Sequence, residues 1–136
     1  MWTSISKTYQ QICYHNGMEH DEHREQSLLI SWFRIQYPKF YWYLWAIPNG
    51  GQRHFGTAMK LKAEGLLAGV SDLFLMIPVG EKHGMFIEMK SKRGVISDKQ
   101  KIFLEKAKEM NYESIVCYSF EEGQEAIKKY LQGIEI

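Results

Sequence analysis

The chain lacks the features that mark secreted and membrane proteins. Its 136 residues include only two cysteines, Cys13 and Cys117, which form no CxxC pattern, and only three prolines. No apolar run reaches the roughly eighteen residues that a membrane-spanning helix needs. Residues 1–14 contain no apolar segment of the kind found in signal peptides. We therefore expect an intracellular protein with reduced cysteines and no contact with a membrane.

The chain also lacks a large charge of either sign, since its formal net charge is +1. Many nucleic-acid-binding domains carry a strong positive excess, so any basic surface here must be local and balanced by acidic residues elsewhere. Hydrophobic residues make up 45% and charged residues 24% of the chain, as in ordinary globular domains. We expect a tail or arm over residues 1–19 and a single domain over residues 20–136.

Hydrophobic spacing predicts the elements of that domain. Leu28, Leu29, Trp32 and Phe33 form an apolar stripe at helical spacing, which predicts a helix over residues 21–37. The apolar runs at 73–77 and 85–90 predict two strands joined as a hairpin. The remaining predicted elements are a strand over 41–47, a helix over 57–64 stopped by Gly65, a helix over 97–110, a strand over 114–118 and a final helix after Ser119. This order, αβαββαβα, predicts an α/β fold with a mixed β-sheet flanked by helices.

Two helix starts carry the pattern of a capping box. In this motif the side chain of a serine and that of the residue three positions later each accept a hydrogen bond from the other's backbone N–H group. Ser97 and Gln100 open one helix, and Ser119 and Glu122 open the last. Inward-facing residues of the last helix are predicted to be Ala126, Ile127, Tyr130 and Leu131.

The predicted strand at 85–90 contains two charges among apolar residues. Glu88 and Lys90 lie two positions apart, so their side chains point to the same face of the sheet. Asp72 stands at the start of the preceding strand, and a hairpin would bring it close to Glu88. Two carboxylates beside a lysine suit a hard divalent cation, which prefers oxygen ligands. Taken singly, Asp72 could be a turn residue, and Glu88 with Lys90 an exposed ion pair of little energetic value.

The joint pattern resembles the PD-(D/E)xK nuclease motif, with Ser71 in place of the proline. The blocks around it resemble, in order, the VRR-NUC family of virus-type replication and repair nucleases, from about Glu25 to the C-terminus. They are Asn49–Arg53, Lys60–Lys62 with Gly65, Gly69–Leu73, Phe86–Lys90 and Ser97–Gln100. The resemblance implies a restriction-endonuclease-like fold.

The resemblance also implies roles for individual residues. Asp72 and Glu88 would hold Mg²⁺ or Mn²⁺, with the backbone carbonyl of Met89 completing the shell. Lys90 would orient or deprotonate the attacking water. Glu25 is similar to a helical acidic residue that supports the metal, although it could equally be a solvated first-turn acid. Gln100 is similar to a glutamine near the site, and its capping role could hold at the same time.

For substrate and assembly, the resemblance is to small stand-alone members, many of them encoded by phages. It implies a homodimeric DNA endonuclease that acts on branched DNA such as four-way (Holliday) junctions. Two alternatives stay open: a nuclease for flaps, nicked or duplex DNA or RNA, and a DNA-binding module that does not cut. Intact Asp72, Glu88 and Lys90 argue against the second.

Several basic residues are candidate DNA contacts. Asn49 and Arg53 frame a glycine-rich loop that could contact phosphates. A local basic rim near Lys90 would attract the DNA backbone without sequence preference. Further candidates are Lys60, Lys62, Lys92, Arg93, Lys99 and Lys101. The histidines His15, His20 and His23 have no metal-binding spacing, and the aromatic residues Trp42, Tyr43 and Trp45 are expected in the core or in a dimer contact rather than stacked on unpaired bases.

Overall fold

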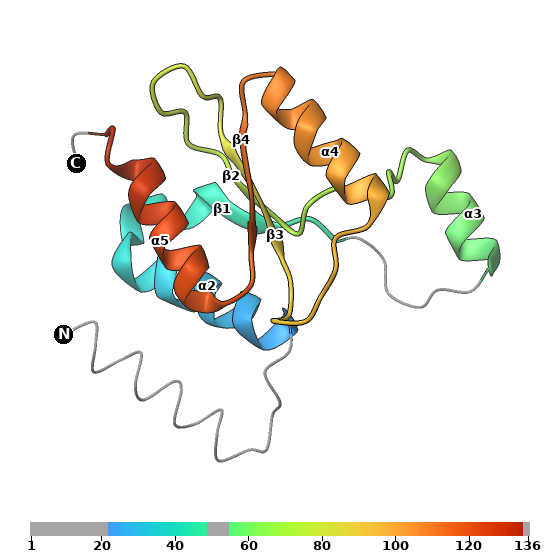
Figure 1. Cartoon of the computed structure of the whole chain (residues 1–136), viewed down its shortest axis with the longest axis horizontal. Coiled ribbons are helices and arrows are strands. Elements are labelled where there is room, and N and C mark those ends of the chain that lie inside the picture. Colours follow the sequence, from blue (N-terminus) through green and yellow to red (C-terminus); the bar gives the residue numbers. More distant parts are fainter. Residues whose placement is uncertain (1–21, 49–54, 135–136) are drawn as a thin grey trace, which may run out of the picture.

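The computed structural model describes residues 22–48 and 55–134, and within them the elements follow the predicted order (Figure 1). A 3₁₀ helix, η1, is an addition to that order. The elements are α2 (Glu22–Gln36), η1 (Pro38–Tyr43), β1 (Leu44–Ala46), α3 (Phe55–Ala63), β2 (Leu73–Leu75), β3 (Met85–Met89), α4 (Asp98–Glu109), β4 (Glu113–Cys117) and α5 (Phe120–Leu131). None of the helices in this part of the chain is long and apolar enough to cross a membrane.

The four strands form one mixed sheet in the order β1-β2-β3-β4. The strands β1, β2 and β3 are antiparallel neighbours, whereas β4 runs parallel to β3, with α4 as the crossover between them. The predicted hairpin of β2 and β3 is confirmed, with Leu73 opposite Ile87. The predicted α/β fold with a mixed sheet is therefore confirmed.

Helices cover both faces of the sheet, and Figure 1 shows α2 and α5 on one side and α4 on the other. The main core lies between the sheet and α2, where Leu29, Trp32, Phe33, Ile87 and Met89 are each at most 1% exposed. The α2 stripe is thus buried as predicted. On the other face, the ring of Phe86 on β3 lies 5.0 Å from that of Phe103 on α4. The side chains at alternate positions of β3 therefore meet different helices.

The predicted strand at 41–47 is wrong for its first half, because Tyr41–Tyr43 belong to η1. Pro38 fixes a backbone angle that suits a helical start. The rings of Tyr37, Phe40 and Tyr43 follow one another at intervals of three residues, with centroids 6.0 Å apart for each neighbouring pair. Three residues per turn is the period of a 3₁₀ helix, so these rings pack in a row. This packing prevails over the strand preference of aromatic residues.

The late start of β1 also shortens its neighbour. Leu44 pairs with Leu75, and no β1 residue precedes Leu44, so β2 ends at Leu75 instead of the predicted Ile77. Of the two places expected for the aromatic cluster, the core is wrong, because Trp42 is 78% exposed and Trp45 is 42% exposed, and the dimer contact stays a prediction. Cys117 is fully buried on β4.

The capping box at Ser97 and Gln100 is confirmed, but the second box is only half formed. The Ser119 hydroxyl accepts from Glu122 N, whereas Glu122 Oε2 accepts from Tyr118 N at 2.7 Å instead of from Ser119 N. Ile127 and Leu131 of α5 are buried, and Ala126 and Tyr130 pack partly buried beside them, so the predicted inner face is confirmed.

Candidate active site

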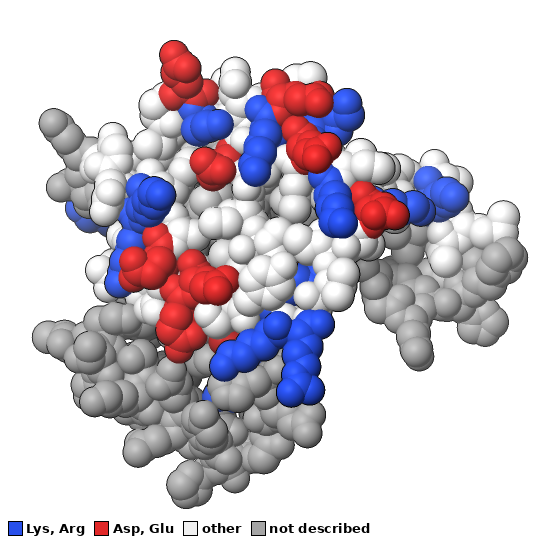
Figure 2. Space-filling model, viewed as in Figure 1, with Lys and Arg blue, Asp and Glu red and all other residues white. Residues whose placement is uncertain are grey.

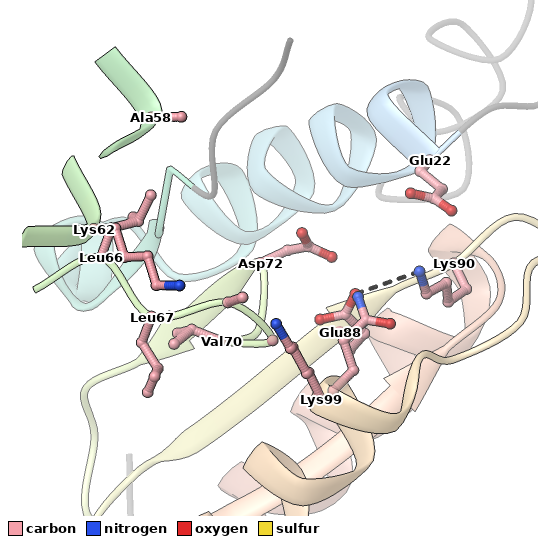
Figure 3. Close-up of a pocket in the computed structure, with 13 residues that line it drawn as sticks. Glu22, Ala58, Lys62, Leu66, Leu67, Val70, Asp72, Glu88, Lys90 and Lys99 are labelled. Atoms are coloured by element: carbon pink, nitrogen blue, oxygen red, sulfur yellow. Dashed lines mark hydrogen bonds and ion pairs between the residues drawn. The ribbon is translucent and has the colours of Figure 1, made fainter. Parts of the chain in front are cut away.

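A cavity of about 610 Å³ lies at the end of the sheet where β3 leaves the core. Figure 3 shows Asp72, Glu88 and Lys90 facing one another across it. Helices α2, α3 and α4 and the loop before β2 supply the remaining walls. The lining residues are Glu22, Ala58, Lys62, Leu66, Leu67, Ala68, Gly69, Val70, Asp72, Glu88, Lys90, Lys99 and Gln100.

Glu88 and Lys90 share the α4 side of the strand, as the alternation of side chains predicts. Lys90 Nζ lies 3.8 Å from Glu88 Oε1, and the two side chains are 14% and 3% exposed. This pair is therefore largely buried, unlike the exposed surface ion pair that was the alternative interpretation. Burying a carboxylate is costly unless it is paired or binds something.

Asp72 lies one residue before β2, and the hairpin brings it to the end of β3. Its Oδ2 atom accepts a hydrogen bond from Met89 N at 2.8 Å, while its own carbonyl accepts from Ile47 N at 2.8 Å. Asp72 is thus held by the backbones of both neighbouring strand segments. The amide of Met89 beside Asp72 also places the Met89 backbone next to the carboxylates, where its carbonyl was predicted to help hold a metal.

The two carboxylates affect each other's protonation. Burial, followed by the negative charge of Asp72, raises the pKa of Glu88 to about 8. Burial also raises the pKa of Asp72, while the hydrogen bond from Met89 N and the charge of Lys90 act in the opposite direction. Without a cation, Glu88 therefore holds a proton at neutral pH, because two adjacent carboxylates in a partly buried site cannot both ionise easily.

Gln100 connects the capping box to this pair. Its Oε1 atom accepts from Ser97 N at 2.9 Å, and its Nε2 atom donates to Glu88 Oε1 at 2.7 Å. The capping contact and the site contact, which the sequence allowed to hold together, are thus made by opposite ends of one amide group. Glu88 Oε1 consequently has Gln100 and Lys90 as neighbours.

The helix acid that reaches the site is Glu22, not Glu25. Glu25 is 7% exposed, and its Oε2 atom accepts from Phe120 N at the start of α5 at 2.8 Å. Glu22, one turn earlier, lines the cavity, and its charge raises the pKa values of Asp72 and Glu88. The structure therefore does not bring the predicted Glu25 to the site. A signal for Glu22 was its place beyond the end of the buried stripe.

Gly69 holds the loop before β2 against α4. Its φ angle is +95°, in a region that side chains rarely adopt, and a Cβ atom there would lie 2.6 Å from the backbone carbonyl of Lys99. Only glycine fits both conditions. The close approach fixes Val70 and Asp72 relative to the first turn of α4, which carries Gln100.

The predicted DNA contacts divide into three groups. Lys62 and Lys99 line the cavity, whereas Lys60, Lys92, Arg93 and Lys101 are exposed outside it. Asn49 and Arg53 lie outside the described residues. Figure 2 shows basic side chains interspersed with acidic ones on the visible face, in keeping with a net charge near zero.

The donor atoms suit Mg²⁺ or Mn²⁺. Over residues 22–48 and 55–134 no group of three or more His, Cys, Asp or Glu side chains is placed to hold a metal ion. Mg²⁺, however, is commonly held by one or two carboxylates, with water and substrate phosphates as its other ligands. Glu88 Oε2 is buried beside Asp72, and when both carboxylates are ionised it has no hydrogen-bond donor in the described part of the chain; in the metal-free site a proton shared with Asp72 takes that place. A cation would supply the missing partner, so the residues fit the metal.

Comparison with known proteins identifies the family. The VRR-NUC domain model matches residues 20–121, so the chain belongs to the VRR-NUC domain family and has a nuclease-type fold. A solved structure named VRR_NUC domain protein superimposes with a TM-score of 0.74 at 24% identity, covering 85% of this chain and 91% of that one. At that identity the likeness shows the shared fold. No curated protein matches the chain.

Proposed function

We propose that this protein is an endonuclease that hydrolyses phosphodiester bonds in DNA with Mg²⁺ or Mn²⁺. Asp72 and Glu88 would hold the cation, and Glu22 would add negative charge at the rim of the same cavity. When bound, such a cation polarises the phosphate and lowers the pKa of a water molecule. The family supports nuclease chemistry, and the chain's own side chains indicate how it would be arranged.

The observation that carries the proposal is the unequal surroundings of the two Glu88 oxygens. Oε1 lies 2.7 Å from Gln100 Nε2 and 3.8 Å from Lys90 Nζ, whereas Oε2 has no partner among the described residues. Gln100 and Lys90 thus orient the carboxylate so that one oxygen stays available next to Asp72. An ionised Glu88 would leave this buried acceptor unsatisfied, and a cation bound between Glu88 and Asp72 in place of their shared proton would satisfy it.

Lys90 has a second function in the proposed reaction. Its ammonium group lies on the same face as Glu88, where it can stabilise the negative charge that develops on a phosphate. The ammonium group would also position the attacking water, and in its neutral amine form Lys90 would accept the proton of that water. Gln100 acts through Glu88 and is therefore a positioning residue.

The finer substrate preference follows from the resemblance to stand-alone VRR-NUC members. On that basis we propose branched DNA, such as a four-way junction, as the substrate and a homodimer as the active form. Two sites related by two-fold symmetry would cut two strands of a symmetric junction.

The test is cleavage of a labelled four-way junction and a matched linear duplex, with Mg²⁺, with Mn²⁺ and with EDTA. Asp72→Ala and Lys90→Ala are compared with wild type, and Lys108→Ala, an exposed lysine outside the cavity and outside the predicted DNA contacts, is the matched control. Circular dichroism confirms that each variant is folded, and light scattering gives the mass. We expect metal-dependent cutting of the junction that both site variants lose and the control keeps.

Other outcomes separate the parts of the proposal. Equal cutting of both substrates would support the nuclease activity and contradict the preference for the junction. A monomeric mass for the active form would contradict the proposed homodimer. Binding of DNA without cutting by wild type, together with no Mn²⁺ binding in calorimetry, would replace the nuclease with a DNA-binding module.

A further inference from the structure

A second hollow adjoins the candidate active site. It has a volume of about 360 Å³ and lies between the loop after α3 and the outer side of α4. It shares Lys62, Leu66, Leu67, Ala68 and Lys99 with the carboxylate cavity, so the two form one continuous groove. The residues that line only the second hollow are Ile102, Phe103 and Lys106. We call this second hollow the side groove.

The side groove combines apolar walls with basic edges. Leu67 is 62% exposed and Ile102 is 56% exposed, on opposite walls. Lys62, Lys99 and Lys106 stand beside them, and no acidic residue lines this part of the described chain. Among residues 22–48 and 55–134, the only ion pair that these lysines make joins Lys106 to Glu109 at 3.2 Å, on the surface, where such pairs contribute little. Apolar area next to positive charge matches a ligand with flat apolar faces and phosphates.

The two walls are fixed to each other before any ligand binds. Leu66 N donates to Leu61 O and Gly65 N donates to Lys62 O, which ends α3 with a Schellman motif and turns the chain toward α4. Gly69 then packs on the backbone of Lys99. Leu67 lies between these two attachments, which hold its side chain at the groove.

We propose that the side groove binds an unpaired nucleotide of the DNA strand next to the phosphate that is cut. This inference rests on the proposed nuclease function, and it names a feature of the substrate. A nucleotide in a duplex has its base faces stacked and its edges paired, so it cannot present a face to Leu67 and Ile102. An unpaired base can do so while its phosphates lie near Lys99 and Lys106. The groove leads directly to Asp72 and Glu88, which favours DNA over a peptide as the occupant.

The experiment measures binding by fluorescence anisotropy in EDTA, so that no strand is cut. The probes are a blunt duplex, the same duplex with a short single-stranded overhang, and one whose overhang keeps its phosphates but lacks its bases. Leu67→Ser and Ile102→Ser are tested in the full chain. Met110→Ser is the matched control, because Met110 is 68% exposed on the far end of α4 and outside the groove.

We expect wild type and Met110→Ser to bind the normal overhang about ten-fold more tightly than the abasic one, as expected for burial of one base face. Leu67→Ser and Ile102→Ser lose that difference but bind the abasic and blunt probes as wild type does. Lys106→Ala weakens binding of both overhangs equally, since it acts on phosphates.

Equal binding of normal and abasic overhangs by wild type would overturn the inference, as would an unchanged base preference in both serine variants. A change of molecular mass in those variants without an effect on base preference would show that the groove joins two copies of the chain. Cleavage is assayed on the same preparations with Mg²⁺. If wild type cuts DNA but shows no base-dependent binding, only the proposal for the side groove is wrong. If wild type neither binds nor cuts DNA, the proposed nuclease function is wrong as well.

Discussion

Glu88 combines burial, an ion pair and an unsatisfied oxygen, and its protonation should be visible in the stability of the metal-free protein. Its pKa is about 8 in the folded chain, against an ordinary value of 4.5. The folded state therefore keeps a proton that the unfolded chain releases between these two values. By linkage, this group makes the free energy of unfolding fall as the pH rises through that window.

The substitution Glu88→Gln removes this titration. We expect its stability relative to wild type to increase from about pH 5 to about pH 8, because only wild type loses stability through Glu88. Urea unfolding in EDTA at several pH values measures the difference. Parallel curves for the two proteins would contradict the raised pKa of Glu88.

The two acids of the first turn of α2 should have separable effects. Glu25→Ala removes the acceptor for Phe120 N at the start of α5, and we expect a loss of about 1–3 kcal/mol in the free energy of unfolding. Glu22→Ala, at an exposed position, should leave stability almost unchanged and weaken Mn²⁺ binding. Unfolding curves and calorimetry on both variants test this. If Glu25→Ala weakened Mn²⁺ binding and Glu22→Ala lowered stability, Glu25 would be the acid that supports the metal.

The difference between these acids shows where sequence reasoning stops. Glu88 and Lys90 could be paired from the sequence because the two-residue period of a strand is a local rule. Asp72 could be added because a short hairpin brings its neighbours together. Glu25 accepts a bond from Phe120, 95 positions along the chain, and no local pattern predicts that contact. Because Glu25 is bound to the start of α5, Glu22 is the acid of this turn that lines the cavity.

At the scale of elements, the contact of the β2 loop with α4 depends on Gly69. Gly69→Ala places a Cβ atom against the Lys99 backbone in a conformation that side chains rarely adopt. We expect a loss of about 1–3 kcal/mol in stability and, because Gln100 shifts, a lower cleavage rate. Thermal unfolding and cleavage assays measure both effects.

Gly56→Ala is the matched control for that substitution. Gly56 lies in α3 with nothing near its Cβ position, so alanine should stabilise the helix by about 0.5–1 kcal/mol. If both alanine variants behaved alike, the tight packing at Gly69 would not be the cause.

Elements were predictable where periodicity agreed with the tertiary contacts. The α2 stripe, the hairpin and the capping box at Ser97 meet that condition. Residues 41–43 did not, because strand preference and a proline-started turn competed and the packing of Phe40 between Tyr37 and Tyr43 decided the outcome. Glu122 similarly had two backbone donors within reach and bonds to Tyr118 N instead of Ser119 N.

For the whole molecule, metal binding should be coupled to folding. A ligand that binds only the folded state stabilises it, by about 2.7 kcal/mol at a hundred times its dissociation constant. We expect Mn²⁺ to raise the unfolding temperature of wild type by several degrees, and not that of Asp72→Asn. Differential scanning fluorimetry with and without EDTA measures this, and an equal shift in both proteins would place the metal elsewhere.

The amide of Gln100 has a consequence for how this position can change. A capping box accepts glutamate as readily as glutamine at its third helical residue, so folding alone does not distinguish them. Ser97 N requires an oxygen at one end of the side chain, which leaves the other end to face Glu88. With glutamate there, that end would be a third acceptor against a carboxylate. A Gln100→Glu variant would therefore keep the contact with Ser97 N and lose the one with Glu88, so this single substitution separates what the helix start requires from what the carboxylates require.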